Sequence, residues 1–493
     1  MPIRITGMNS GLDTEAIITE LASAKEYKKT QLEKEQKRLE WKQEAWKNLN
    51  TKIYNLYTKT LSNLRFDSAY QKNITTCSDE NAASIVASGT APKSTQTLSI
   101  TNLAKAAYMT GTELGDGTKG YTKDTKLSEL GITADTSIEV TIGGEKKPLE
   151  LKADSTISDF TKQMKKLGLT ANFDEANQRI YVSAKDTGED YNFEFSGDEE
   201  ALKALGLSES NGAKKIDGEN AQIVLNGVTY ISNDNVFEIN GLTITAQKET
   251  ESETTITTKT DTSGIYDTIK NFIKSYSELI NEMDKLYNAD AAKGYDPLSD
   301  DEKEAMSETE IEKWEEKIKD SLLRRDSTLS SVSSAMKSVM SAGVTMSDGT
   351  KMYLFDFGIE TLGYFNAPDN EKNAYHINGD ADDADTSGKE NTLEAMIASD
   401  PDKVTEFFTG LTKNLYDSLT KNMSRVEGMR SYMHVYNDVQ MKEQYNEYKE
   451  KIEKQQEAID TFMDRWYDKF TAMETALAKI NSYSSSISSI LGM

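Results

Sequence analysis

Two long segments at opposite ends of the chain, each with apolar residues spaced three and four apart, constrain the fold more than any other feature. The first runs from Asp13 to about Asn63 without a proline or a glycine. An uninterrupted helix of this kind, about 50 residues long, measures about 75 Å, so its narrow apolar seam must pack on another long helix. Its seam positions recur in heptads and are Leu32, Leu39, Trp46, Leu49, Ile53 and Leu56.

The carboxy-terminal segment has a matching seam and is the natural partner. Its apolar positions follow the same spacing, apart from the polar Gln455 and a polar Lys469 whose neighbour continues the stripe. A stripe of methionine and aromatic residues at helical spacing is typical of packing rather than of a ligand-binding site. We therefore predict an antiparallel coiled-coil leg built from both chain ends, with a second seam formed by Ile452, Ile459, Phe462, Trp466, Phe470, Met473 and Ile480.

The part of the chain between the seams is first β-rich and then helical. From about Ser78 to Asp261 the composition shifts to Thr, Ser, Ile, Val, Gly and Asn, and short apolar runs are separated by hairpin signals such as Asn226-Gly227 and Asn240-Gly241. The heptad pattern returns from Gly264. Two further expectations are a β-like stretch at Met352 to Phe357 and a final short helix that begins at Pro401.

These patterns predict an α+β multidomain protein in which β-rich head domains are inserted into a helical leg. The predicted division has four parts: terminal helical segments at 1–42 and 455–493, a leg domain at 43–75 and 264–454, a β-rich head domain at 76–110 and 218–263, and a second α+β head domain at 111–217.

Charge and composition exclude several classes of function. The chain has 493 residues with 82 acidic and 57 basic side chains, a net charge of -25, which disfavours nucleic acid and anionic membrane as partners. No apolar run is long enough to span a membrane, and the first residues lack the apolar core of a cleaved signal peptide. The chain has one cysteine, Cys77, and two histidines, His376 and His434. These are too few to favour a Ser-His or Cys-His nucleophile pair or a histidine-rich zinc site. We expect no enzyme, no catalytic residue and no cofactor.

The first helix is locally basic, with nine basic and five acidic residues between Lys25 and Lys52. Two interpretations stay open. The helix face is solvated and carries pairs such as Glu33 with Lys37, or it is a dedicated surface for an acidic partner. The first is the more common arrangement and is the one we expect.

Two short motifs have alternative interpretations. Gly115 to Gly120 has the spacing of a dinucleotide fingerprint but lacks the preceding strand and following helix, so we expect a flexible loop. Asp383, Asp385, Ser387 and Glu394 have the spacing of a calcium loop, yet the segment before Asp383 is not helical in pattern. We expect an acidic surface loop there rather than a metal site.

Several blocks, in order along nearly the whole chain, resemble hook-associated protein 2, the bacterial flagellar filament cap family. The opening Gly11-Leu12-Asp13-Thr14 with Ile17-Ile18 and Leu21 is similar to the start of that family. The other blocks are Ser84 to Gly89, Leu98 to Ala106, Ile223 to Gly227 with Asn235-Val236, Gly241 to Thr245, Tyr295 to Leu298, Trp314 to Lys317, Leu322 to Asp326, Ala398 to Val404 with Phe407-Phe408, and Phe470 to Glu474 with Ile480 to Ser482.

The resemblance implies a structural protein at the distal tip of the flagellar filament that promotes folding and polymerisation of exported flagellin. It implies terminal segments that are mobile until assembly, a homo-oligomer, often a pentamer, and export through the flagellar type III pathway without a cleaved signal. The implied partners are further copies of the chain, flagellin, hook-filament junction proteins, the export apparatus and its export chaperone. Another axial flagellar junction protein, or a cap whose heads also act as an adhesin, are the alternatives.

Overall fold

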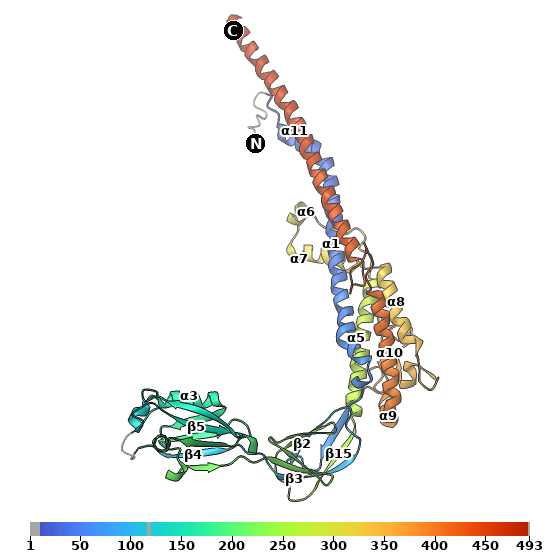
Figure 1. The fold of residues 1–493 in the computed structure, drawn as a ribbon. Coiled ribbons are helices and arrows are strands. Elements are labelled where there is room, and N and C mark those ends of the chain that lie inside the picture. The colour runs from blue at the N-terminus through green and yellow to red at the C-terminus, as the bar shows by residue number, and fades with distance from the viewer. Residues whose placement is uncertain (1–9, 116–119, 492–493) are drawn as a thin grey trace. The chain divides into compact units, whose positions relative to one another are not determined.

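The computed structural model describes residues 10–115 and 120–491, and the chain divides into two compact units (Figure 1). Unit 1 contains both ends of the chain, Met1–Tyr70 and Ser263–Met493, and unit 2 is Gln71–Thr262. The predicted architecture is confirmed, because the long terminal helices pair with each other and the β-rich part is inserted between them. Of the predicted terminal segments, residues 1–9 and 492–493 lie outside the described residues.

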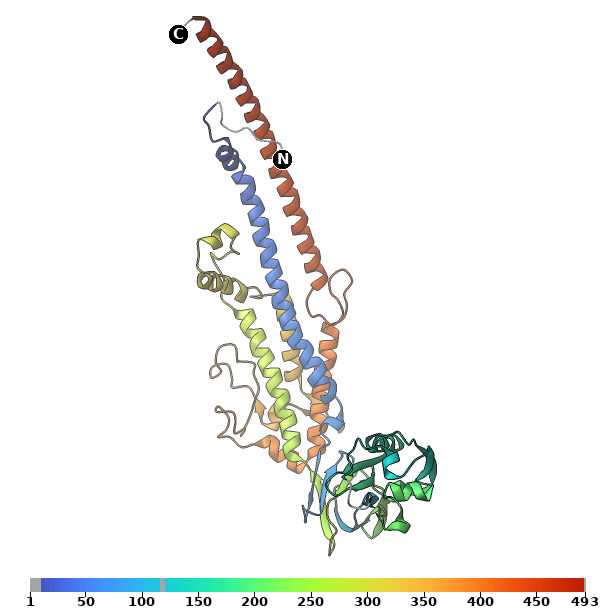
Figure 2. The same ribbon diagram turned by 90° about the vertical axis from the view of Figure 1, so that its left-hand side faces the viewer.

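Two long helices form the extended part of unit 1. Helix α1 (Thr14–Asn55) begins where Asp13 accepts a hydrogen bond from the Ala16 backbone, and helix α11 (Asp438–Leu491) is the longest element of the described chain. They lie side by side and run in opposite directions (Figures 1 and 2). Pairing is what their narrow seams require, because neither helix could bury its seam alone.

The first helix does not stay regular to Asn63 as predicted. At Leu56 it passes into a π-helical segment, η1 (Leu56–Leu61), followed by the short α2 (Ser62–Leu64) and the 3-10 turn η2 (Asp67–Ala69). Contacts with a distant helix accompany the change: the Tyr57 ring stacks on Tyr416 at 4.2 Å between centroids, and the Thr412 hydroxyl lies 2.7 Å from the Leu64 carbonyl oxygen. Such tertiary contacts have no signal in a heptad pattern.

The remaining helices of unit 1 pack beside α1 or in the bundle at its end, and two of them begin at residues typical of helix starts. The Ser307 hydroxyl caps α7 and Pro401 occupies the first turn of α10. The final short helix predicted from Pro401 is wrong in length, since α10 has 22 residues. These helices are α5 (Thr262–Asn288), α6 (Asp300–Glu304), α7 (Glu308–Asp320), α8 (Ser327–Ala342), α9 (Thr392–Ser399) and α10 (Pro401–Asn422).

Short antiparallel pairs of strands complete unit 1: β16 (Val344–Thr345) with β17 (Lys351–Met352), and β18 (Ile359–Glu360) with β19 (His376–Ile377). The β-like stretch predicted at Met352 to Phe357 is therefore wrong beyond Met352. Residues Leu354–Phe357 form a 3-10 turn, η6, which turns the Phe357 ring onto Phe407 at 4.4 Å between centroids.

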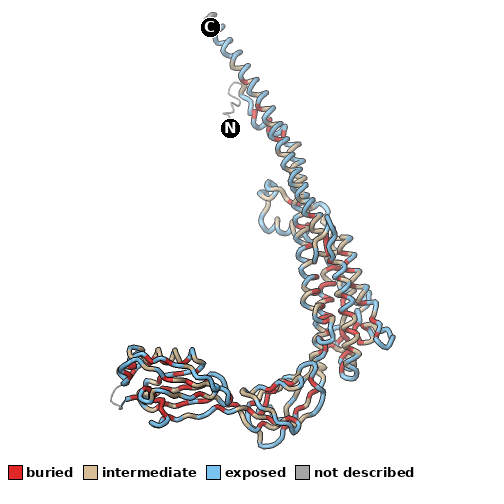
Figure 3. The backbone as a smooth tube through the Cα atoms, viewed as in Figure 1, coloured by how far each residue is buried: buried red, intermediate tan, exposed pale blue. Residues whose placement is uncertain are grey.

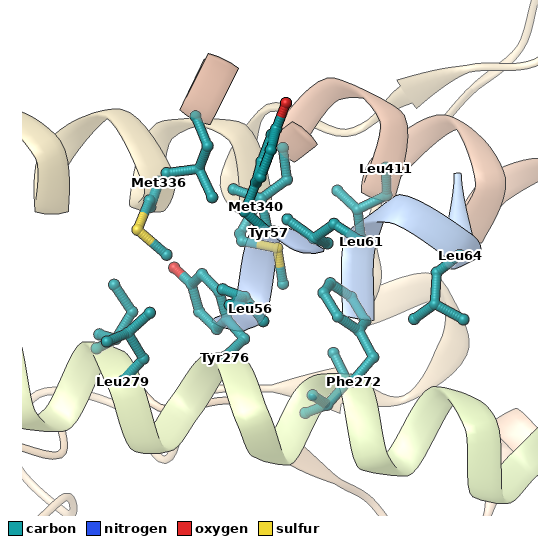
Figure 4. Close-up of a cluster of buried hydrophobic side chains, with 14 of the residues drawn as sticks. Leu56, Tyr57, Leu61, Leu64, Phe272, Tyr276, Leu279, Met336, Met340 and Leu411 are labelled. Carbon is teal, nitrogen blue, oxygen red and sulfur yellow. The ribbon is translucent and has the colours of Figure 1, made fainter. Parts of the chain in front are cut away.

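One hydrophobic core joins α1, α5, α8, α9 and α10 of unit 1 (Figure 4). Leu56, Tyr57 and Leu61 from the end of the first helix meet Phe272 and Tyr276 of α5. Methionines of α8 and leucines of α10 fill the space on the other side. Figure 3 shows the consequence, because buried residues are dense in this bundle and sparse along the free part of α11.

Unit 2 contains two hydrophobic cores, and we name the parts around them the first and second lobes. The first lobe is two antiparallel sheets whose inner faces share Leu98, Ile100, Ile223, Ile244 and Ile256. One sheet has the strand order β1 (Asn73–Cys77), β15 (Thr254–Thr260), β3 (Thr95–Asn102), β11 (Ala221–Leu225), β12 (Val228–Ser232), and the other has the order β13 (Val236–Ile239), β14 (Leu242–Ala246), β2 (Ala83–Ala87).

The core of the second lobe runs from Ala107 to Ala213. Its two sheets have the orders β10 (Lys214–Ile216), β4 (Tyr108–Glu113), β8 (Arg179–Ala184), β7 (Leu169–Asp174), and β6 (Glu145–Leu151), β5 (Thr136–Ile142), β9 (Phe193–Gly197). The helices are α3 (Ile157–Leu167) and α4 (Glu199–Ala204), with 3-10 turns η3 (Leu127–Leu130), η4 (Glu189–Tyr191) and η5 (Glu209–Asn211).

The predicted hairpins of unit 2 are confirmed. Asn226-Gly227 joins β11 to β12 and Asn240-Gly241 joins β13 to β14. All four residues have φ between 47° and 80°, the left-handed conformation that a two-residue type I′ turn requires and that Asn and Gly tolerate. These turns set the strand registers on which the outward faces of the first lobe depend.

Candidate self-assembly surface

Side chain to backbone hydrogen bonds align α1 with α11 and with the loop that leads into it. At the bundle end, the Asn50 side chain donates to the Met433 carbonyl at 3.2 Å and accepts from the Val435 amide at 2.9 Å. About two turns further, the Gln43 amide donates to the Met441 carbonyl at 2.8 Å. Each of these bonds joins residues almost 400 positions apart, so they specify how the two chain ends align.

The predicted seam of α1 has two parts with different surroundings. Trp46, Leu49, Ile53 and Leu56 are buried in the core of the bundle. The Trp46 ring stacks on Tyr436 at 5.4 Å between centroids and 8° between planes. These four residues therefore hold unit 1 together, and their side chains are not available on the surface of the single chain.

Towards the chain ends the seam lies mainly between α1 and α11, although Leu39 still packs against the edge of the bundle core. We call this the terminal pair, residues 14–40 of α1 with 452–487 of α11. Leu32 and Leu39 are half-buried, as are Ile452, Phe462, Trp466 and Phe470, whereas Ile459 is 2% exposed. The rings of Phe462, Trp466 and Phe470 follow one another with centroids 6.3 and 6.0 Å apart.

Polar groups also take part in the terminal pair. The Gln455 side chain donates to the Lys25 carbonyl at 3.2 Å, and the Lys25 ammonium lies 5.3 Å from the centre of the Phe462 ring. Near the start of the described chain, the Ser10 hydroxyl donates to the buried carboxylate of Glu474. A buried carboxylate needs such a donor, since desolvation penalises its charged form.

The seam of α11 continues past the point where α1 begins. Met473 is half-buried, but Ile480 is 60% exposed, and Tyr483 and Ile487 follow it at spacings of three and four. In the part of the chain that the structure describes, no element covers these three side chains. The start of α1 has exposed apolar residues as well; we call the two groups the terminal stripes, Leu12, Ile17 and Leu21 together with Ile480, Tyr483 and Ile487.

Sequence reasoning missed five buried members of the terminal pair. Ile18 and Ala22 of α1 are fully buried, and Thr14 of α1 and Tyr467 and Glu474 of α11 are nearly so. The signal for the first two was present as a spacing of four that leads into the heptads, although the positions that follow are lysines. For the others there was no such signal, because the predicted stripe used the neighbouring Trp466 and a glutamate is not expected in a seam.

The basic side chains of α1 face acidic residues of the same chain. Lys34, Arg38 and Lys42, spaced by four residues, pair with Glu302, Asp296 and Asp326 at 2.6, 2.5 and 2.9 Å. The three acids belong to residues 289–326, which we call the arm. The hydrogen bond from Lys34 lowers the pKa of Glu302, and the Ser299 amide adds to this effect. The solvated face that we expected does carry pairs along the helix, but they join Lys29 to Glu33 and Lys37 to Glu40 rather than Glu33 to Lys37. The pairs with the arm were not predicted and neutralise part of the basic face within the chain.

The calcium-loop motif has another structure. Asp383 accepts from the Asp385 amide and lies 2.7 Å from His376 Nδ1, whereas the Asn391 side chain lies 3.3 Å from the Glu394 carboxylate. Among the described residues, no group of three or more histidine, cysteine or acidic side chains is placed to hold a metal ion. Of the glycine-rich loop from Gly115 to Gly120, Asp116 to Lys119 lie outside the described residues. None of the described helices is long and apolar enough to cross a bilayer.

Comparison with known proteins gives one consistent result. The family model described as flagellar hook-associated protein 2, C-terminus, matches residues 218–482, and the N-terminus model matches residues 10–107. The flagellar hook-associated protein 2 of Escherichia coli strain K12 is 24% identical over 497 residues, which cover 97% of this chain and 96% of that protein. That of Halalkalibacterium halodurans is 22% identical over 457 residues, with 85% and 81% covered.

A solved structure agrees at the level of the fold. The crystal structure of the D1-D2-D3 domains of the flagellar cap protein FliD from Escherichia coli superposes with a TM-score of 0.50 at 23% sequence identity. The superposition covers 76% of this chain and 95% of that one.

Proposed function

Because this chain belongs to the flagellar hook-associated protein 2 family, we propose that it caps the distal tip of the bacterial flagellar filament and promotes folding and polymerisation of exported flagellin there. The family is structural rather than enzymatic. The chemistry of the chain accords with a mechanical role, in which binding surfaces, and not reacting groups, carry the function.

The observation that carries the proposal is the pair of terminal stripes. Apolar side chains just before α1 and on its first turns, and on the last turns of α11, are exposed in the single chain, although helices bury such stripes when a partner is present. An axial assembly supplies that partner in the form of neighbouring helices. The stripes on Leu12 and Ile17, and on Ile480 and Ile487, would then be covered only in the filament cap.

The proposed division of labour follows from this placement. The bundle of unit 1 is the stable part of the leg, the terminal pair with its predicted seam residues makes the axial contacts, and unit 2 supplies the head domains. For the heads we keep the predicted division into a domain of residues 76–110 with 218–263 and a domain of residues 111–217, with one change. We propose that the second domain starts at Ala107, because that residue packs in the core of the second lobe.

Several copies act together in this proposal. The chain assembles as a homo-oligomer, with a pentamer as the family expectation, and it contacts flagellin and the hook-filament junction proteins. It leaves the cell through the flagellar type III export apparatus, with its export chaperone, and works outside the cell at the filament tip. Insertion of each flagellin subunit shifts the legs among lattice positions.

The test is complementation of a bacterial strain whose own filament cap is deleted. A chain of residues 41–453 keeps the bundle core and both lobes, so it should fold, with circular dichroism typical of mixed helix and strand. We expect it to leave the strain without filaments while flagellin monomers accumulate in the medium. Full filaments from this truncated chain would mean that the bundle and the heads cap without the terminal pair, and the proposed role of the chain ends would be wrong.

A sharper variant keeps the whole chain. Replacing Ile480 and Ile487 by Asp changes two exposed side chains, so the fold should persist, yet charges on the stripe should prevent axial packing. The matched control replaces Ser482 and Ser485, exposed on the same helix, by Asp. We expect filaments with the control only. Equal filament numbers from both variants would contradict the role of the terminal stripes.

A further inference from the structure

One outward sheet face of the first lobe is unusual for this chain. Cross-strand pairing shows which side chains share a face: Thr76 lies opposite Thr257, Thr257 opposite Thr95, and Thr255 opposite Thr97. On the other side of β3, Ser99 lies opposite Val224, which lies opposite Thr229. The alternate residues of the same strands, such as Leu98 and Ile256, form the buried core, so these rows point away from it.

We call this surface the threonine face. It consists of twelve positions on the five strands, all of them exposed or half-buried: Ile74, Thr76, Thr255, Thr257, Lys259, Thr95, Thr97, Ser99, Gln222, Val224, Thr229 and Ile231. Six are threonines, three are other β-branched residues, and only Lys259 is charged. The sheet lies in the part of unit 2 labelled β3 and β15 (Figure 1).

Folding alone does not require a face without charges. In the whole chain 28% of residues are charged, and exposed positions normally carry most of them. The second lobe shows the ordinary pattern, because the outward face of β5 and β6 bears Glu139 and Lys146, paired at 3.1 Å, together with Glu150. The threonine face has the same strand geometry but not the charges.

We propose that the threonine face is the surface on which another copy of this chain packs. The inference rests on the proposed function, in which several copies assemble. Two copies with a net charge of -25 each repel one another, and approach is least unfavourable at a face without acids, where Lys259 is the one charged side chain that must be covered. β-branched side chains on a pleated sheet also give a flat, stiff surface that loses little conformational freedom when it is covered.

The size of the face sets the strength of the contact. Five strands about 4.8 Å apart and about five residues long at 3.3 Å each present about 400 Å². Two copies would bury about 800 Å² in total, below the roughly 1,200–2,000 Å² of stable complexes. The threonine face therefore gives weak association in solution, and a stable assembly needs the other contacts of the cap in addition.

The test places either sign of charge at the centre of the face in the full chain. Thr97 lies on β3, the central strand, and we would replace it by Glu and, separately, by Lys. The matched controls are Ser137→Glu and Ser137→Lys, at an exposed position of β5 in the second lobe. Sedimentation velocity up to about 100 µM measures self-association, since contacts this small have dissociation constants near that range.

We expect both Thr97 variants to raise the dissociation constant by about tenfold or more, with melting temperatures within about 3 °C of the parent chain, while both controls associate like the parent. A burial effect is independent of sign. If only Thr97→Glu weakened association, net charge would be the cause and the proposal would be wrong. Unchanged association in both variants, or a parent chain that does not self-associate at all, would also overturn it.

The filament assay separates this proposal from the proposed function. If the parent chain restores filaments and the Thr97 variants associate normally, the proposal for the threonine face is wrong and the capping function is retained. If the chain associates through this face but restores no filaments, the capping function is wrong and the proposal for the face is retained.

Discussion

Replacing Ile459 by Asp tests whether the terminal pair is an independent, marginal part of the leg. Ile459 is 2% exposed and lies in the contact between α1 and α11. The loss of its burial costs about 2 to 3 kcal/mol. A carboxylate held in an apolar contact adds several kcal/mol more, unless it reaches water.

The structure indicates how the carboxylate reaches water. Before Trp41, the buried residues of the described part of α1 are Thr14, Ile18 and Ala22, and after Met441 those of α11 are Ile459, Tyr467 and Glu474. Burial of these few side chains stabilises the closed terminal pair by about 5 kcal/mol, and the conformational entropy that the helices gain on opening reduces this value. The penalty of the substitution is of the same size, so the terminal pair should open while the bundle stays folded.

Hydrogen exchange read by mass spectrometry measures this directly, because it resolves local opening from global unfolding. Peptides from 452–470 should lose protection by about a hundredfold or more, whereas peptides from α5 should not change and the main melting transition should move by less than about 3 °C. The control is Ala458→Asp, an exposed neighbour on the same helix. Unchanged protection at 452–470 would show that the seam does not hold the pair, and a large fall in melting temperature would refute the division into bundle and terminal pair.

Three further predictions concern charged groups of unit 1. Arg38→Glu should loosen the arm, detected as faster hydrogen exchange at 289–326, and the double variant with Asp296→Arg should recover about 0.5–1 kcal/mol of the loss, an effect that 1 M salt should abolish (about a 3 Å screening length). Because the pKa of Glu302 is lowered in the folded chain, its pair with Lys34 contributes fully above the unfolded pKa of about 4.3, and the contribution is lost as pH falls from there through the lower folded-state pKa; Glu302→Gln should remove at most about 1 kcal/mol at pH 7 and less at pH 3, measured by urea unfolding. Millimolar calcium should leave the melting temperature unchanged in the parent and in Glu394→Gln alike, since Asp383 is engaged by His376; a rise that Glu394→Gln removes would establish a calcium site.

The parts of the fold that sequence predicted are those set by local periodicity. A seven-residue repeat at both ends specifies two long helices that must find each other, and Asn-Gly pairs between apolar runs specify hairpins with one register. The positions of Trp46 on α1 and of Asn226 on the β11–β12 turn follow from these rules without knowledge of the rest of the chain.

What sequence could not predict depends on distant partners. The change to a π-helical segment at Leu56 accompanies stacking of Tyr57 on Tyr416, a residue more than 350 positions away. Likewise, Trp46 and Leu32 occupy equivalent heptad positions, yet one is buried in a core and the other is half-buried in a two-helix contact. The difference lies in where α5, α8 and α10 end, which no pattern within α1 encodes.

The placement of polar seam residues limits how a leg of this kind could move. Gln43 bonds the backbone of α11 and Asn50 makes two bonds to the loop just before it, so sliding α1 along α11 and this loop would break three bonds in a partly buried contact. The terminal pair has the weaker bond from Gln455 at 3.2 Å, and Lys469 is exposed. If legs shift between lattice positions as flagellin is inserted, register slippage is therefore the unfavourable route. Movement of the leg as a whole breaks none of these three bonds, and neither does opening of the terminal pair between Gln43 and the chain ends. The part of the leg that can adapt is therefore the part that carries the exposed terminal stripes.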